Sequence, residues 1–421
     1  MKKLGRETKW ITLSLLALAA CEDESSRRPG GDAAVSSDGS QDAPSSDGAV
    51  ADSALADGAF AGEVGPSAMG KIMSLGARDV SRQAHAVVEL ADRQVLVIGG
   101  IKFPSPLSGL TDTTLYDVTA GSFSVVGRMQ DGRHSHSATL LANGRVLVAG
   151  GYGGMPAATW RTAELYDPTT KAFTRVANEM SIPRLGHGAF TLSMGALAGK
   201  VLIMGGGALG TPLTVEVFDP ATSMFSPVTT VDAPMERQGA AFAQLTDDSV
   251  LITGGRTMAN AAAVLDSYVY VPSTATFRRV ADALQSRRFP TATTLGDGRV
   301  LVVGGQSGSS GAGDELATTE LYDPAMARFI AGPPMSSPRR NHTAARLGSG
   351  RVLIAGGNGP SSTLRTTEIF APATNTFTSG SDLGQALSLI ESVALSDGRV
   401  FLMGGQGMTG LVNRGAELFS E

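Results

Sequence analysis

A pair of adjacent glycines recurs seven times in this chain, each time after a run of apolar residues rich in valine and leucine. The doublets begin at Gly99, Gly150, Gly205, Gly254, Gly304, Gly356 and Gly404. Successive doublets are 51, 55, 49, 50, 52 and 48 residues apart. A period near 50 residues indicates a repeat protein in which each unit forms one supersecondary structure and stacks on its neighbours.

The second unit shows the expected structure of each repeat. Residues 135–141 predict a strand, and Asn143-Gly144 suits the tight turn of a β-hairpin because both positions favour positive φ. Residues 146–149 are wholly apolar, as expected for a strand buried on both faces. Residues 163–168 predict a third strand that ends at a proline, and residues 173–176 predict a fourth. Four antiparallel strands make one propeller blade.

The third strand has a recurring signature of glutamate, an aliphatic residue and an aromatic residue. It begins at Glu164, Glu216, Glu320, Glu368 and Glu417. The last copy ends at Glu421, which leaves no room for a fourth strand. We therefore predict that residues 71–75, which precede the first unit, pair with the C-terminal strands and close the ring, since an open blade would expose an unpaired edge.

These units resemble kelch repeats in their glycine doublets, their third-strand aromatic residues and a further aromatic residue near the fourth strand. In many kelch repeats that last residue is tryptophan, but here it is Phe123, Phe173, Phe225, Phe277, Phe329 and Phe377. The resemblance covers residues 71–421 and implies an all-β fold, a seven-bladed kelch-type β-propeller. The family includes both enzymes and binding scaffolds, so the fold leaves the function open.

The copper-radical oxidases with such propellers, galactose oxidase and glyoxal oxidase, require a cysteine cross-linked to a tyrosine. The only cysteine here is Cys21, near the N-terminus. The sequence also has no nucleophile elbow, phosphate loop, HExxH zinc motif or dinucleotide-binding motif. We accordingly expect no cofactor, no metal and no assigned catalytic residue.

The N-terminal segment has the features of a lipoprotein signal peptide. Residues 1–20 combine a positively charged start with a short apolar run, which is too short to span a bilayer. The run ends in Leu18-Ala19-Ala20-Cys21, which resembles the bacterial lipobox. We expect Cys21 to carry the lipid and to be the contact with membrane lipid. The alternative is an ordinary cleaved signal with a cysteine nearby by chance.

Residues 21–66 predict a disordered acidic tether between the anchor and the propeller of residues 67–421. The tether is rich in Ser, Asp, Gly and Ala, so it cannot bury enough apolar surface to offset the entropy of ordering. The whole chain has a formal charge of −5, which gives no basic surface for nucleic acid. We expect a monomer at the outer membrane or cell surface.

Two polar positions recur at the start of the first strands. Eight residues before the leucine that ends each first strand lie Arg82, Arg133, Arg184, Arg237, Arg287 and Arg339, with Leu387 in the seventh unit. Three residues further on lie His85, His136, His187, Ala240, Pro290, His342 and Ile390. First strands line the central channel, so a cationic ring and a histidine belt at its mouth are conceivable as an anion or metal site. We favour a structural role, with the arginines pairing with the third-strand glutamates and the histidines satisfying backbone groups.

Specificity is expected where the copies differ. The loop after each glycine doublet and the loop between blades emerge at the same end of an antiparallel blade. Phe103, Tyr152 and Trp160 lie in such loops of the first two units and are the candidate ligand-binding residues. The alternative is that Trp160 merely covers its own loop.

The sequence therefore predicts a lipid-tethered binding module of the cell envelope that recognises a glycan or a protein. The alternative is a carbohydrate-active enzyme resembling the kelch sialic-acid epimerases, with its site at the channel mouth. An enzyme should show a deep pocket containing a carboxylate or histidine with a perturbed pKa, whereas a binding module should show a shallow aromatic patch.

Overall fold

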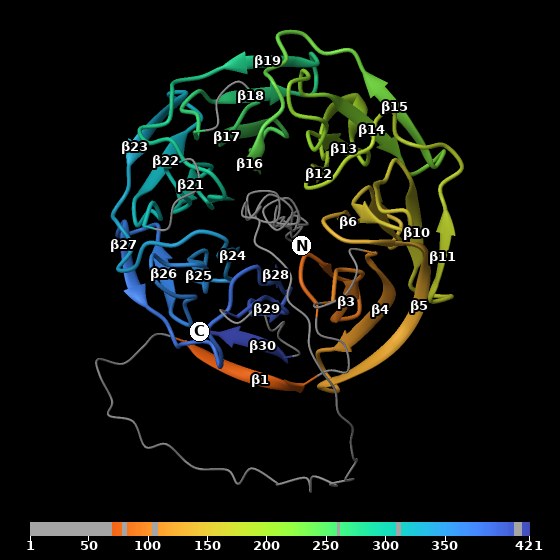
Figure 1. Ribbon diagram of the computed structural model, residues 1–421, viewed down its shortest axis with the longest axis horizontal. Coiled ribbons are helices and arrows are strands. Elements are labelled where there is room, and N and C mark those ends of the chain that lie inside the picture. The colour runs from red at the N-terminus through yellow and green to blue at the C-terminus, as the bar shows by residue number, and fades with distance from the viewer. Residues whose placement is uncertain (1–69, 78–81, 103–107, 259–261, 309–312, 408–414) are drawn as a thin grey trace, which may run out of the picture.

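Seven four-stranded antiparallel sheets surround a common axis in the computed structural model (Figure 1). The structure describes residues 70–77, 82–102, 108–258, 262–308, 313–407 and 415–421. Within these ranges the only helix is a 3-10 turn, η1 (Gly195–Leu197). No helix in the described part of the chain is long and apolar enough to cross a membrane. The predicted fold class, an all-β seven-bladed propeller, is confirmed.

Each sheet is one blade, numbered in chain order with its strands given from the axis outward. Blade 1 contains β2 (Ala86–Glu89), β3 (Gln94–Ile98), β4 (Leu110–Asp117) and β5 (Ser122–Arg133); blade 2, β6 (Ser137–Leu140), β7 (Val146–Ala149), β10 (Ala163–Asp167) and β11 (Ala172–Arg175); blade 3, β12 (Gly188–Thr191), β13 (Val201–Met204), β14 (Val215–Asp219) and β15 (Met224–Val228); blade 4, β16 (Gln238–Gln244), β17 (Val250–Arg256), β18 (Tyr268–Val271) and β19 (Thr276–Arg279). Blade 5 contains β20 (Thr291–Thr294), β21 (Val300–Val303), β22 (Thr319–Asp323) and β23 (Arg328–Ala331); blade 6, β24 (Thr343–Arg346), β25 (Val352–Ala355), β26 (Thr367–Ala371) and β27 (Thr376–Ser379); blade 7, β28 (Glu391–Ala394), β29 (Val400–Met403), β30 (Gly415–Ser420) and β1 (Lys71–Ala77). A two-stranded ribbon, β8 (Tyr152–Gly153) and β9 (Ala158–Thr159), projects from blade 2.

The core lies between the blades, which explains why the second strands are apolar throughout. Leu147 in β7 and Val201 in β13 belong to one buried cluster shared by blades 2 and 3. Phe218 in the third strand of blade 3 completes this cluster, and its ring is tilted against that of Phe225 with the centroids 4.9 Å apart. A fully buried valine or leucine contributes roughly 1.5–3 kcal/mol, so these seams hold the ring together.

The N-terminal strand completes the last blade. β1 pairs antiparallel with β30, with Lys71 opposite Ser420 and Met73 opposite Leu418. Figure 1 shows β1 running along the outer edge of blade 7, beside the C-terminal strand. Ile72 packs against the apolar cluster at the seam of blades 6 and 7. The pairing predicted for residues 71–75 is therefore present in the structure.

The glycine doublets allow neighbouring blades to approach closely. Gly150 and Gly151 have φ values of +65° and +94°, which L-residues with a side chain rarely adopt. A Cβ on Gly150 would lie 2.6 Å from the carbonyl oxygen of Arg184 in blade 3. The N–H of Gly151 donates a 2.7 Å hydrogen bond to that same oxygen. The doublet thus links one blade to the next through the backbone, and this explains its recurrence.

Candidate functional site

The variable loops meet at one end of the propeller, which we call the loop face. Six isolated β-bridges connect the two kinds of loop. In five of them, a residue just before a first strand pairs with a residue just after a glycine doublet. In the sixth, the residue before the first strand pairs with a residue just before a third strand. The pairs are Gln83–Ile101, His134–Tyr152, Pro212–Met235, Arg288–Gln306, Arg340–Asn358 and Ser388–Gln406. The described parts of the two kinds of loop therefore lie together at the same end of the propeller, as the sequence predicted.

The two candidate aromatic residues within the described part of the chain lie at the β8–β9 ribbon on this face, Tyr152 in β8 and Trp160 directly after β9. Tyr152 is half-buried, and its ring centroid lies 5.4 Å from that of His134. The Trp160 Nε1–H donates a 3.1 Å hydrogen bond to the carbonyl of Gly132. A Cβ on Gly154 would lie 2.7 Å from Trp160 Cζ2, so the indole packs directly over its own loop.

These contacts support the alternative interpretation of Trp160, a structural cover. Trp160 is also half-buried, so part of its ring still faces solvent. Phe103 lies outside the described residues, and the grouping of all three aromatic side chains stays a prediction.

The recurrent arginines are buried and bind the glycine doublets. In every case Nη1 donates to the carbonyl of the first glycine in the same blade, at 2.7–3.4 Å. The pairs are Arg82–Gly99, Arg133–Gly150, Arg184–Gly205, Arg237–Gly254, Arg287–Gly304 and Arg339–Gly356. Because these carbonyls belong to residues with positive φ, the guanidinium fixes the turn that the doublet makes.

Most of these arginines also form a buried ion pair with a third-strand carboxylate. The distances are 3.1 Å for Arg133–Glu164, 2.8 Å for Arg184–Glu216, 2.6 Å for Arg287–Glu320 and 2.8 Å for Arg339–Glu368. In blade 4 the partner is Asp266 instead, 2.5 Å from Arg237. The arrangement is that of the structural interpretation, in which each of these arginines uses its guanidinium donors inside its own blade.

The histidines lie in the seams between blades. The Nε2 atoms of His187 and His342 lie 2.8 Å and 2.9 Å from hydroxyls of the preceding blade, Ser137 Oγ and Thr291 Oγ1. Burial, together with the nearby arginine, lowers the pKa of each of these two histidines to about 3. The same causes hold the pKa of His85 well below its usual value. These rings are therefore neutral at physiological pH.

His134 lies in the loop before blade 2 and is buried beside Tyr152. Burial lowers the pKa of His134 to about 4. Among the residues that the structure describes, no three His, Cys, Asp or Glu side chains are grouped to hold a metal ion.

Sequence reasoning missed two carboxylates. Glu236 precedes Arg237 on the loop face, is 2% exposed and accepts a 3.1 Å hydrogen bond from Gly207 N–H. Burial raises the pKa of Glu236. The signal in the sequence was that Glu236 stands directly before Arg237, one of the recurrent arginines.

The second missed carboxylate is Glu417, which sequence reasoning grouped with the arginine-paired glutamates. It lacks such a partner in its own blade because Leu387 occupies the arginine position. The leucine at that position was the available signal.

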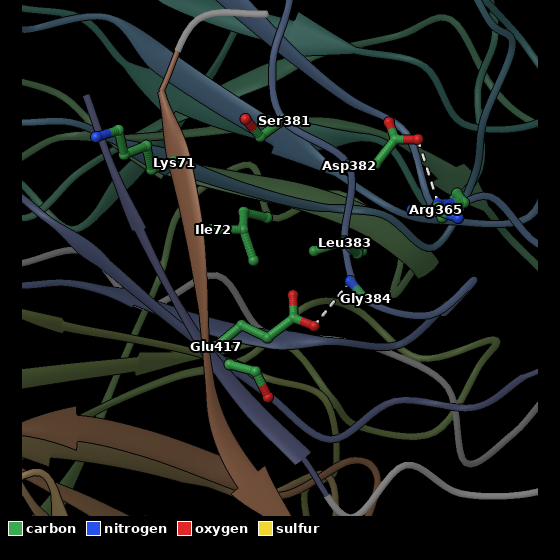
Figure 2. Close-up of a pocket in the computed structure, with 9 residues that line it drawn as sticks. Lys71, Ile72, Arg365, Ser381, Asp382, Leu383, Gly384 and Glu417 are labelled. Atoms are coloured by element: carbon green, nitrogen blue, oxygen red, sulfur yellow. Dashed lines mark hydrogen bonds and ion pairs between the residues drawn. The ribbon is translucent and has the colours of Figure 1, made fainter. Parts of the chain in front are cut away.

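Two pockets lie away from the predicted aromatic residues. One of about 400 Å³ is at the outer seam of blades 6 and 7 (Figure 2), and it is lined by Lys71, Ile72, Ser74, Arg365, Ser381, Asp382, Leu383, Gly384 and Glu417. The other, of about 260 Å³, lies at the outer edge of blades 2 and 3 and includes Arg145 and Met224. Neither is lined by Tyr152, Trp160 or the recurrent arginines.

Comparison with known proteins finds the kelch motif in this chain. The kelch motif matches residues 287–336, which contain all four strands of blade 5. The tRNA wybutosine-synthesizing protein 4 of Saccharomyces cerevisiae (strain ATCC 204508 / S288c) is 26% identical over 185 residues. That match covers 42% of this chain and 26% of the yeast protein, so this chain spans about a quarter of that relative's length.

A solved structure of a fungal alcohol oxidase of the AA5 family, in complex with copper, resembles this one with a TM-score of 0.66 and 19% identity. The likeness covers 84% of this chain and 76% of that chain, and it shows the fold alone. Cys21, the only cysteine of the sequence, lies outside the described residues, so the likeness carries no statement about a copper centre in this chain. Seven blades of one design, the kelch motif in blade 5 and this structural likeness identify the chain as a kelch-repeat β-propeller.

Proposed function

We propose that this protein is a lipid-anchored binding module of the cell envelope whose loop face recognises a protein partner. The kelch propeller fold supports a binding or interaction role in general. The observation that carries the proposal is the loop face itself, where loops that differ between blades are held by backbone bridges to a frame of sheets that repeats from blade to blade. A rigid frame with variable loops is the usual arrangement of a recognition surface.

A protein ligand is favoured over a glycan by exposed methionines on the loop face. Met155, between β8 and β9, is 84% exposed, and Met258, after β17, is 72% exposed. Met235 lies on the same face before blade 4 and is 44% exposed. Methionine is flexible and polarisable, and it is common on protein-binding surfaces. Glycan recognition would instead depend on flat aromatic rings, and Trp160 donates its N–H to Gly132 in β5 and packs part of its ring over Gly154 in its own loop.

A binding comparison tests the loop face. Photo-crosslinking on intact cells should capture a discrete partner with the wild-type protein, and Met155→Ser with Met258→Ser should reduce the yield several-fold. The matched control is Met224→Ser with Met326→Ser, since both methionines are exposed but lie at the opposite end of the blades, Met224 at the start of β15 and Met326 in the turn between β22 and β23. Equal loss in both double variants would contradict a role for the loop face. A glycan array signal that requires Tyr152 and ignores the methionines would favour a glycan ligand.

The anchor is the second part of the proposal. It is supported by the lipobox ending at Cys21 and by the acidic tether of residues 21–66. A flexible coil of that length has a root-mean-square span of roughly 35–40 Å, which would hold the propeller clear of lipid headgroups.

Cys21→Ala should move the protein from the membrane fraction to the soluble fraction, or leave it unprocessed, and should abolish labelling with an alkyne fatty acid. Unchanged fractionation and labelling would refute the anchor.

The enzyme alternative has one observation in its favour, the buried Glu236 with its raised pKa on the loop face. A carboxylic acid that stays protonated at higher pH is suited to general acid catalysis. Proton NMR of a sialic acid incubated with the protein tests this directly. Epimer interconversion that is lost in Glu236→Gln and kept in Glu179→Gln, a change of an exposed glutamate on blade 2, would support the enzyme. Interconversion at the uncatalysed rate would reject it for that substrate.

A further inference from the structure

Blade 7 lacks an ion pair that four other blades share. In blades 2, 3, 5 and 6 the third-strand glutamate accepts hydrogen bonds from the blade's own arginine and from backbone N–H groups of the segment that precedes the blade's first strand. Glu417 occupies the same position in β30 of blade 7. The arginine position there holds Leu387, which is buried in the apolar cluster of blades 6 and 7.

The Glu417 carboxylate is consequently buried with one of its two oxygens unpartnered within the described part of the chain. The residue is 8% exposed, and Oε1 accepts a 2.9 Å hydrogen bond from Gly384 N–H. Within the described part of the chain, Oε2 has no hydrogen-bond partner. Burying a charged oxygen without a partner costs free energy, because water solvates it well. The burial also raises the pKa of Glu417.

The pocket of about 400 Å³ opens beside this carboxylate. Figure 2 shows the Glu417 carboxyl group, Ile72 and Leu383 around a common space, with Lys71 projecting to the other side of β1. Arg365 is turned towards Asp382, with Nε 3.2 Å from Oδ2, and its side chain is 59% exposed. The pocket therefore combines one under-coordinated carboxylate with an apolar wall, and its nearest arginine already has a partner.

We propose that this pocket binds a guanidinium or primary ammonium group carried on a short alkyl chain, with Glu417 as its acceptor. The fold uses this chemistry elsewhere, since guanidinium nitrogens lie 2.6–3.1 Å from the equivalent glutamates of four blades. Here the cation comes from outside the blade. Ile72 and Leu383 contact the alkyl chain, and the site is independent of the loop face.

The cation has two possible sources, a free small molecule and the arginine side chain of a peptide. Isothermal titration calorimetry of the full-length protein with n-butylguanidine, n-butylamine and the uncharged isostere n-butylurea tests the first source. The peptide acetyl-Gly-Arg-Gly-amide, with citrulline replacing arginine as its uncharged counterpart, tests the second. We expect at least one cationic probe to bind roughly 10- to 100-fold more tightly than its uncharged counterpart, which is the range for a charge-assisted hydrogen bond.

Two variants and one control make the test specific to Glu417. Glu417→Gln should remove the preference for the cation by removing the acceptor's charge. Leu387→Arg should also abolish binding, because it supplies the guanidinium that the other blades contain, and it should raise the melting temperature. Glu179→Gln makes the same charge change on the surface of blade 2 and should leave binding unchanged.

Binding of the peptide alone would support the proposal and identify the source as a polypeptide. Binding of n-butylguanidine or n-butylamine would support it with a small molecule as the source. The proposal is overturned if no cation binds, if the uncharged isosteres bind equally well, or if Glu417→Gln binds as the wild type does. Should Leu387→Arg fail to fold, Glu417→Gln still decides the outcome.

Discussion

At the scale of single residues, the recurrent arginines show which contacts can be predicted from a repeated sequence position. Their sequence register was sufficient to predict a pairing with third-strand glutamates, and four such pairs are present. The contact with the glycine carbonyl was not predictable, because it depends on the positive φ of the doublet and on the direction in which its carbonyl points. A recurring charged residue in a sequence thus predicts a side-chain partner of opposite charge more readily than it predicts a backbone partner.

Removing one member of such a pair should be costly. Arg287→Leu leaves Glu320 buried without its cation and the Gly304 carbonyl without its donor. We expect a loss of about 3–5 kcal/mol in the free energy of unfolding, measured by urea denaturation. Adding Glu320→Gln to that variant should recover part of the loss, because it removes the uncompensated charge. A single variant as stable as the wild type would show that the pair contributes nothing.

The buried histidines predict acid sensitivity. The pKa of His342 is about 3 in the folded protein and about 6.5 in the unfolded chain. Between these values the unfolded state binds a proton that the folded state does not. The free energy of unfolding should therefore fall as the pH drops from about 6.5 towards 3, by at most about 1.4 kcal/mol per pH unit for each such histidine.

Melting temperatures measured from pH 7 to pH 4 check this expectation. His342→Ala should give a shallower dependence on pH than the wild type, and Ala240 at the equivalent position of blade 4 shows that the fold accommodates alanine there. Parallel curves for the two proteins would mean that His342 does not control the acid response.

At the scale of elements, regular strands were predictable and irregular ones were not. The four strands of each blade follow from apolar runs between turn residues. The β8–β9 ribbon was not predicted, because Gly153, Gly154 and Pro156 within and beside it favour a turn. The geometry of the candidate site was therefore the least predictable part, since Tyr152 and Trp160 take their positions from that ribbon.

The closing strand gives the sharpest prediction at this scale. Deleting residues up to Ala77 removes the partner of β30 and exposes the apolar seam that Ile72 covers, so the melting temperature should fall by several degrees or the protein should aggregate. Deleting only residues 21–66 is the control and should leave the melting temperature nearly unchanged. Both can be followed by circular dichroism and light scattering, and identical behaviour of the two deletions would contradict the role of β1.

At the scale of the whole molecule, the fold was predictable because the same short pattern occurs seven times and each copy supports the others. The ligand was not predictable, because a recognition surface consists of the parts that differ, and each differing loop occurs once. Glu417 illustrates the limit, since only the structure shows that its missing arginine coincides with a pocket.

The shared cores predict that the propeller unfolds as one unit. Each seam combines apolar residues of two neighbouring blades, so the loss of one blade exposes both of its neighbours. Trp160 is the only tryptophan in the described part of the chain and reports on blade 2, whereas circular dichroism reports on all the strands. The two signals should give coincident urea transitions. Separate midpoints would show that blade 2 unfolds independently.

The pairing of β1 with β30 also imposes an order in time. Ribosomes make the N-terminal strand first and the C-terminal strand last, so β1 must wait unpaired while every other blade is synthesised. Blades 1 to 6 are each built from consecutive residues, but the seventh requires β1 together with β28, β29 and β30. Closure of the ring therefore has to wait for the synthesis of β30, and any factor that delays the pairing of β1 with β30 delays completion of the ring.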